Sequence, residues 1–476
     1  GPRTEDSYTR ESMARRAILL PLIFLLVASL ECRRAASASE DPFDVEGREA
    51  LIGYLRIDTS NPPGNETAGA RYLQQLLARN GIPAQLVGSD PRRQSVYARL
   101  RSGTNEKALL LLSHIDVVPA AANEWTKPPF AGLVEQGYIW GRGALDIKSL
   151  GIAEAMAMIE LKRTNAPLMR DVVFLATADE EAGGQHGAKE LLETRRELFE
   201  NVGFVLNEGG YNETVVDHVA FWGIEVQQKV PLWLRIHASG VGGHAAAPPD
   251  DGGSVVKLLH ALDAVEKIET PYRLTPDVER FFHDAGAARK DERGEVMRNI
   301  ENEGADRITR VLTPAFRALL RDTIALTHVQ AGTSTNSIPA SAVADVDIRL
   351  LPDERHEEML QRVRDAAGAN GSVEVLLTSD PVPATSSDTE LFRLLEQKMT
   401  ADEAGSRVAA IVGAGTTDSR YFRSRGIVAY GFAPFKVNYY DAGTIHGNDE
   451  RIRTRFFADG TRLVRAVVGG FCARAK

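Results

Sequence analysis

The chain has 476 residues, enough for two or three domains, and its hydrophobic content of 43% and charged content of 25% are ordinary for a globular protein. A formal net charge of -9, with no stripe of basic residues, argues against nucleic acid as a partner. After residue 40, no stretch is apolar over the length that a membrane-spanning helix needs.

The first 38 residues have the layout of a secretory signal peptide. Arg15 and Arg16 precede an apolar run over residues 17–30, and Ala36-Ser37-Ala38 offers an A-x-A cleavage site. We therefore expect export to a periplasm or beyond, and the alternative is a membrane anchor made by residues 17–30. Cleavage would leave Cys472 as the one cysteine, so any metal must be held by histidine and carboxylate.

Next along the chain, amphipathic helical patterns alternate with short apolar runs, which predicts an α/β domain. Helices are expected over 44–57 and 66–80, with strands at 84–87, 95–100, 172–178 and 203–206. The longest apolar run starts at Ala108 and reads ALLLLSHIDVVP, which is typical of a strand buried on both faces of a parallel sheet.

The apolar runs in this region end in residues that can bind metal. The carboxyl ends of strands in open α/β sheets carry ligand and catalytic groups. His114 and Asp116 are two residues apart, so on an extended backbone both side chains point the same way. Each strand end alone could be a solvated turn, and Asp146 alone could be a helix cap. Their recurrence favours a site made of His114, Asp116, Asp146, Glu180, Glu181, Glu208 and His446.

The pattern changes near residue 227. Residues 230–238 and 342–350 alternate like half-exposed antiparallel strands, and helices are expected over 254–266 and 355–367. This predicts an inserted α+β domain with an open antiparallel sheet. The segment 275–322 is highly charged, and we expect a solvated helical insertion there. The predicted divisions are 1–38 (extension and signal peptide), 39–226 (catalytic domain, first part), 227–381 (inserted domain) and 382–476 (catalytic domain, second part).

Two histidines and several carboxylates without cysteine suit hard or borderline divalent ions such as zinc, manganese or cobalt. One carboxylate between two ions about 3.5–4 Å apart is the geometry of two-metal hydrolases. A spare carboxylate would act as general base on a water, and Asp116 could orient the His114 ring. The sequence contains no G-x-S-x-G elbow, no phosphate-binding loop and no H-E-x-x-H helix, so competing chemistries lack support.

Six ordered motifs resemble the M20 family of metallopeptidases and amidohydrolases, which includes aminoacylases, glutamate carboxypeptidase and carboxypeptidase S. They are SHIDVVP, WTKPPF, GRGALDIKS, DEEAGG, NEGG and HGNDE. The resemblance covers essentially the whole chain after the signal segment. It implies an α/β fold of the zinc-exopeptidase type, with a mixed, mainly parallel sheet between helices. It also implies that the inserted α+β domain acts as a lid and as the surface of a homodimer.

The resemblance implies two metal ions, zinc in the first place, with cobalt or manganese as alternatives. His114, Asp146 and Glu208 match the ligands of one ion. Glu181, His446 and Asp146 match the ligands of the other ion, so that Asp146 bridges the two.

Further roles follow from the same resemblance. Glu180 matches the general base, and Asp116 matches the acid that positions the ring of the first histidine ligand. The family often has a cis peptide bond after the bridging aspartate, which corresponds here to the bond between residues 146 and 147.

The resemblance also extends to the substrate. His244, in GGHAAAP, matches a histidine that stabilises the oxyanion and in dimers often comes from the partner subunit. Asn336 and Arg349 match groups that hold the substrate's carboxylate, although Arg349 could instead form a surface ion pair. Gly415 and Thr416 belong to a loop that resembles a lining of the substrate pocket.

The expected reaction is cleavage of a peptide or N-acyl amide bond next to an amino acid with a free carboxylate. The chain length and the WTKPPF motif are most similar to the carboxypeptidase S and N-acyl-amino-acid hydrolase branch. Two alternatives remain open: an aminopeptidase or dipeptidase with the same metal centre, and a catalytically inactive binding homologue.

Overall fold

A computed structural model describes residues 41–474, and the expected signal segment with its cleavage site lies outside this range. Within the described range, no helix is long and apolar enough to cross a bilayer. The chain divides into a unit that ends at Glu46 and a larger unit that begins at Gly47.

Within the described residues, a mixed sheet of nine strands has the order β1-β2-β6-β3-β7-β17-β9-β16, with β8 attached to β9. Strand β3 lies parallel to both β6 and β7, and β17 is parallel to β7. The strands are β1 (Ala84–Val87), β2 (Ser95–Leu100), β3 (Ala108–His114), β6 (Val172–Thr177), β7 (Val202–Asn207), β8 (Tyr211–Val215), β9 (His218–Gln228), β16 (Arg407–Gly413) and β17 (Val428–Gly431). The predicted mixed sheet with a parallel centre is thereby confirmed.

Helices cover both faces of this sheet, which explains why β3 is buried along its whole length. Leu110 and Leu112 pack on one face with Leu191 of α5 and Phe422 of α13. The alternate residues of β3 point to the other face, where α4 packs on the sheet and α15 packs on α4. The helices are α2 (Pro42–Leu55), α3 (Glu66–Arg79), α4 (Lys148–Arg163), α5 (Ala188–Thr194), α12 (Glu390–Asp402), α13 (Ser419–Arg423), α14 (Tyr439–Ala442) and α15 (Thr454–Cys472).

The segment that crosses from β3 to α4 contains regular structure. It contains β4 (Leu133–Glu135) and β5 (Tyr138–Trp140), which pair with β18 (Arg451–Arg453) in a small antiparallel sheet. This pairing brings the segment before α4 next to the segment that follows α14. The peptide bond between Asp146 and Ile147, just before α4, is cis, as the family resemblance implied.

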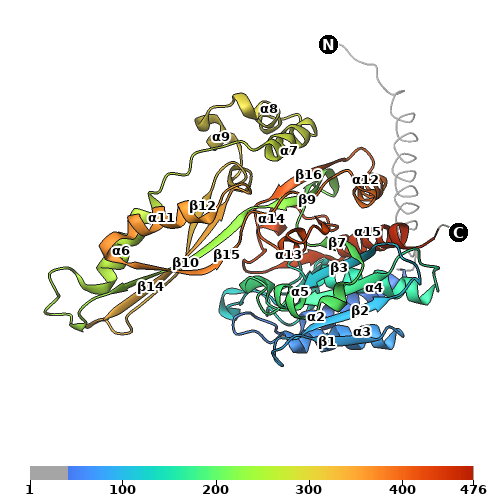
Figure 1. The fold of residues 1–476 in the computed structure, drawn as a ribbon, viewed down its shortest axis with the longest axis horizontal. Coiled ribbons are helices and arrows are strands. Elements are labelled where there is room, and N and C mark those ends of the chain that lie inside the picture. Colours follow the sequence, from blue (N-terminus) through green and yellow to red (C-terminus); the bar gives the residue numbers. More distant parts are fainter. Residues whose placement is uncertain (1–40, 475–476) are drawn as a thin grey trace, which may run out of the picture. The chain divides into compact units, whose positions relative to one another are not determined.

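A second sheet has four antiparallel strands in the order β12-β14-β10-β15. They are β10 (Val230–Ser239), β12 (Thr323–Ala331), β14 (Ser341–Leu350) and β15 (Ser372–Thr378). Helices α6 (Gly253–Glu266) and α11 (His356–Ala367) lie along these strands and share one core with them (Figure 1). Burial alternates along β14, as the sequence predicted for a sheet covered on one face. Two further strands, β11 (Gly243–His244) and β13 (Ser337–Ile338), pair with each other in a separate small sheet.

The charged segment 275–322 is helical as predicted, but the expectation of a solvated insertion is wrong for one of its faces. It forms α7 (Pro276–Ala287), α8 (Glu292–Arg298), α9 (Ala305–Val311) and α10 (Pro314–Ala318). Phe281 and Phe316 pack against Phe221 of β9 and Ile411 of β16. Burying a phenylalanine stabilises a fold by roughly 1.5–3 kcal/mol. The charges therefore lie on the outer side of an amphipathic set of helices that packs against the nine-stranded sheet.

Candidate active site

Several of the predicted residues lie at one edge of the sheet, at the ends of three neighbouring parallel strands. His114 ends β3, Glu180 begins the short 3-10 turn that follows β6, and Glu208 follows β7. The carboxyl ends of parallel strands meet at one edge, so these side chains converge. Asp146 comes from the turn before α4, and His446 comes from the segment after α14. The sequence-predicted set therefore assembles from five separate parts of the chain.

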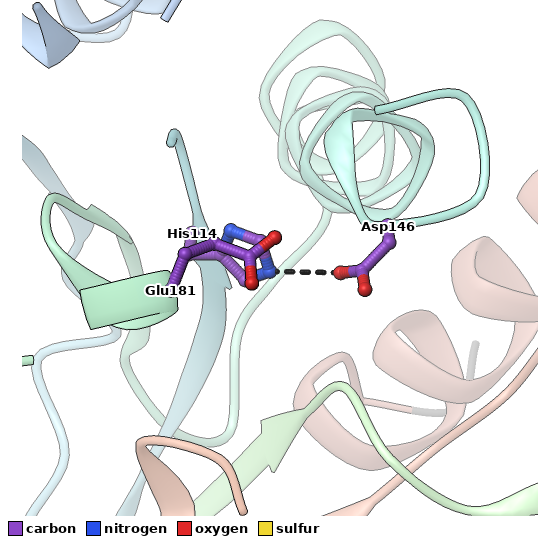
Figure 2. Close-up of side chains that lie close together, drawn as sticks. All are labelled: His114, Asp146 and Glu181. Carbon is purple, nitrogen blue, oxygen red and sulfur yellow. Dashed lines mark hydrogen bonds and ion pairs between the residues drawn. The ribbon is translucent and has the colours of Figure 1, made fainter. Parts of the chain in front are cut away.

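Asp146 lies between the two histidines. Its Oδ1 is 3.0 Å from His114 Nε2, and its Oδ2 is 3.0 Å from His446 Nε2. Glu181 Oε2 lies 3.2 Å from His446 Nε2, and Glu208 Oε1 lies 3.6 Å from His114 Nε2. Figure 2 shows the contact between His114 and Asp146 with Glu181 alongside. Each oxygen of one carboxylate thus faces a different histidine, as a bridging ligand requires.

These side chains fit divalent cations. Ligand atoms of His114, Asp146 and Glu181 lie within 4.8 Å of one another, and so do those of His114, Glu180 and Glu208. All are imidazole nitrogens or carboxylate oxygens, the donors that zinc, manganese and cobalt accept. Glu181 Oε1 is buried and has no hydrogen-bond partner among the described residues. An orphaned buried acceptor is costly, and a cation would satisfy it.

In this cluster, protons and cations compete for the same carboxylate and imidazole atoms. Burial, together with the charge of Glu208, raises the pKa of Glu180 well above its usual value. Burial likewise raises the pKa of Glu208 to about 7. Hydrogen bonds to Asp146 and Glu181 raise the pKa of His446 to about 11. Protons thus partly neutralise the cluster when it holds no cation, and bound cations would take their place.

Asp116 contacts the site differently from the expectation. The His114 Nδ1–H donates to the main-chain oxygen of Asp116 at 2.8 Å, whereas the Asp116 carboxylate lies 3.7 Å from that nitrogen. The carboxylate instead accepts from the backbone N–H groups of Glu180 and Glu181 at 3.1 Å each, and from Asn61 at 2.8 Å. The peptide carbonyl fixes the ring so that Nε2 faces Asp146, and the carboxylate holds the turn that carries the two glutamates.

Sequence reasoning missed Glu450, which is fully buried behind the site. Its carboxylate accepts from Arg142 Nη1 at 2.8 Å and from the backbone N–H groups of Gly143, Leu145 and Asp146 at 3.0, 2.7 and 3.0 Å. Glu450 therefore shapes the turn that presents Asp146. The residue falls inside the HGNDE motif, but nothing local distinguished it from a solvated acid.

His244 and Asn336 are brought together, but away from the carboxylate cluster. His244 lies in β11 and is exposed, and the backbone N–H of Ala245 donates to the main-chain oxygen of Asn336 at 3.0 Å. The His244 Nδ1 accepts a hydrogen bond from the backbone N–H of Ala246 at 3.0 Å. Neither residue lines the cavity over the cluster. Their predicted contacts with the substrate stay a prediction.

Arg349 lines that cavity, but its guanidinium is already engaged. Nε and Nη2 donate to the two carboxylate oxygens of Asp347 at 2.7 and 2.8 Å, and the guanidinium lies 5.5 Å from the centre of the Trp233 ring. The ion pair that the sequence left open as an alternative is thus present. Gly415 and Thr416 line the same cavity, as predicted for the pocket loop.

The cavity has a volume of about 1690 Å³. Sites for small molecules usually measure about 300–1,000 Å³. Its lining joins the carboxylate cluster to Trp233 of the second sheet and to Phe281 and Phe316 of the helical segment 275–322. The site therefore offers more room than an amino acid alone requires.

A mixed sheet with this cluster at the carboxyl ends of its strands defines a metal-dependent hydrolase of the amidohydrolase and peptidase class. The family described as Peptidase family M20/M25/M40 matches residues 110–469. Because the match covers most of the chain, the protein belongs to this family, and it is an M20 enzyme, as the motifs implied.

Relatives within the family have named activities. The chain is 31% identical over 426 residues to an N-fatty-acyl-amino acid synthase/hydrolase of Xenopus tropicalis, covering 85% of this chain and 81% of the relative. It is 27% identical over 427 residues to aminoacylase-1 of Sus scrofa, covering 86% and 91%.

Solved structures share the fold. Human carnosine dipeptidase 1 aligns with a TM-score of 0.72 at 15% identity over 90% of this chain and 97% of that chain. An M20 metallo-carboxypeptidase of Sulfolobus solfataricus aligns with a TM-score of 0.68 at 19% identity, over 89% and 98%. These likenesses establish the zinc-exopeptidase type of fold.

Proposed function

We propose that the chain hydrolyses N-acyl amino acids, releasing an amino acid with a free carboxylate, at a centre of two zinc ions that cobalt or manganese can replace. The observation that carries the proposal is Asp146, whose two oxygens face His114 and His446, while Glu180 lies close to His114. The names of the relatives support an N-acyl amino acid as the substrate.

In the proposed mechanism, a single side chain, Glu180, transfers the proton. When bound, the two ions would lower the pKa of a water and polarise the amide carbonyl. Glu180 takes the proton of the attacking water and passes it to the leaving nitrogen. The Asp116 carboxylate accepts a hydrogen bond from the backbone N–H of Glu180, so the position of Glu180 is prepared before substrate binds.

The substrate's other contacts are proposed to come from β11, from the residue before β13 and from β14. His244 would donate a hydrogen bond to the carbonyl oxygen as negative charge develops on it. Because His244 does not line the cavity of its own chain, a second copy in a homodimer is proposed to supply it together with Asn336. Arg349 would pair with the carboxylate of the released amino acid in exchange for Asp347.

The test is a panel of N-acyl amino acids and free-amine dipeptides followed by mass spectrometry, with and without chelator. Chelator-sensitive release of amino acid from blocked substrates is the expected result. Cleavage of free-amine dipeptides alone would replace the proposal with a dipeptidase or aminopeptidase. No turnover by fully metal-loaded protein across the panel would favour a binding homologue.

Export is proposed on the strength of the signal-like segment 17–38. Expression of the full precursor followed by fractionation and N-terminal sequencing tests it. A mature chain that starts near Ser39 in the exported fraction is expected. An intact chain in the membrane fraction would support the anchor instead.

A further inference from the structure

The helical insert, defined as residues 275–322, lines the same cavity as the carboxylate cluster. Its helices α7 and α10 and the turn after α10 contribute Phe281, Phe316 and Leu319 to the lining, and β16 contributes Ile411. These four side chains also belong to the buried cluster through which the insert packs on the catalytic sheet. The insert thus gives the cavity an apolar wall. Cleavage of the amide bond at the carboxylate cluster does not itself require such a wall.

This wall begins close to the carboxylate cluster. Gly209, Gly210 and Tyr211 follow Glu208 directly, and all of them line the cavity. Three residues of extended chain span at most about 11 Å, which bounds the distance between the Cα atoms of Glu208 and Tyr211. The Tyr211 ring packs edge-on against Phe316, with their centres 5.9 Å apart. A group attached to a carbonyl at the cluster can therefore reach the insert.

The aromatic part of the wall is firmly packed. The ring of Phe281 lies 5.9 Å from that of Phe221 in β9 and 6.1 Å from that of Phe316. The lining also contains the charged residues Glu213 and Arg293. Glu213 is ion-paired with Arg289, so its charge is compensated within the protein. An apolar ligand would therefore meet a preformed surface whose carboxylate is already paired.

We propose that the insert is the binding wall for the acyl chain, and that it makes the enzyme prefer long apolar acyl groups to acetyl. The proposal rests on the proposed function, since it concerns the acyl half of that substrate. The amino-acid half is assigned to Arg349 on β14, so the two halves extend from the amide towards different walls of one cavity. Each methylene that the wall removes from water raises kcat/KM by roughly fourfold until the wall ends.

Ala315 offers a direct test because it is exposed, lines the cavity and is not part of the buried cluster. Ala315→Trp should fill the space beside Phe316 without disturbing the core. In a series of N-acyl-phenylalanines from acetyl to palmitoyl, we expect the ratio of kcat/KM for palmitoyl to that for acetyl to fall at least tenfold. The matched control is Ala305→Trp in α9, an exposed alanine of the same insert that does not line the cavity; its ratio should equal that of the wild type.

Two results would overturn the proposal. One is a wild-type enzyme that cleaves acetyl substrates as well as or better than long-chain ones. The other is an Ala315→Trp variant that keeps its chain-length ratio but changes its preference among amino acids at a fixed acyl group, since the wall would then bind the amino-acid half.

A binding experiment separates this proposal from the proposed function. Calorimetry with dodecanoate should detect binding to metal-loaded wild type and to Ala305→Trp, and weaker binding to Ala315→Trp by at least tenfold. If no N-acyl amino acid is hydrolysed but this pattern of binding is seen, the proposed function fails and the apolar wall stands. If hydrolysis occurs but dodecanoate binds all three proteins equally, the wall fails and the proposed function stands.

Discussion

The carboxylate cluster and strand β11 both carry predicted catalytic residues, but the surroundings of these residues differ. His114 and Asp116 are buried, and the Asp116 carboxylate alone accepts three hydrogen bonds of 2.8–3.1 Å. His244 is exposed, in a strand of two residues, and its ring accepts one hydrogen bond. One region is therefore prepared by buried hydrogen bonds within a single chain, whereas the other is exposed, and its contact with the substrate depends on the homodimer proposed above.

The largest expected effect tests the prepared region. Glu180→Gln keeps the size of the side chain but removes the base, so kcat should fall by a factor of roughly 10²–10⁴. Metal content, measured by inductively coupled plasma mass spectrometry, should stay the same. A variant that retains full turnover would show that another group carries the proton.

The next effect tests the exposed region. His244→Ala should lower kcat by a factor of roughly 10²–10³, because a donor to the developing oxyanion is lost. Metal content should again be unaffected. If a second copy supplies His244, mixing Glu180→Gln and His244→Ala chains should yield mixed dimers that are active although neither variant is. Activity that is absent from the mixture at every ratio would place both residues in one chain's site.

A smaller effect is expected behind the cluster. Glu450→Gln keeps the shape but weakens the hydrogen bonds that fix the turn before Asp146, so metal affinity should fall by roughly 10–100-fold. The variant should also unfold at a lower temperature, because the buried guanidinium of Arg142 loses its counter-charge. Competition with a chromophoric chelator measures the affinity. Glu200→Gln removes an exposed charge and should match the wild type; equal losses in both variants would argue against the positioning role.

Metal affinity should also depend on pH. The pKa of Glu208 is raised to about 7 and that of His446 to about 11, so protons occupy ligand atoms at neutral pH. Cations must displace these protons, so affinity should rise with pH between about 6 and 8, by up to about tenfold per unit for each proton released. Titration calorimetry in buffers of different ionisation enthalpy counts the protons. A metal affinity that does not change between pH 6 and 8 would show that protons do not occupy the ligand atoms.

The smallest effect concerns the link between the two regions. Lys229 joins β9 to β10 and donates to the carbonyl oxygens of Ala318 and Arg321 at 3.0 and 2.8 Å. Burial lowers its pKa to about 7, so between pH 7 and 10.5 the unfolded chain binds more protons and the free energy of unfolding rises with pH. The melting temperature of wild type relative to Lys229→Met should therefore increase over this window. If the melting temperatures of the two proteins change with pH in parallel, Lys229 stays charged in the folded state.

Much of the fold could be predicted because its signals are local. The apolar run at 108–113 is buried on both faces, and the strands 84–87 and 95–100 were located residue for residue between turn-forming residues. The hairpin of β8 and β9 was missed, since β9 is buried on nearly every residue and shows neither alternation nor a purely apolar composition. The burial of the insert was missed because abundant charge masked the apolar face of α7.

The sequence by itself determined which residues gather at the site. An apolar strand that ends in an acid or a histidine places that side chain at the sheet edge, and this depends only on neighbouring residues. Tertiary structure alone decided how those residues are held. The Asp116 carboxylate binds the turn of Glu180 and Glu181, and Glu450 supports a turn some 300 residues earlier in the chain. Hydrogen-bond partners so distant along the chain are chosen by packing, on which local periodicity carries no information.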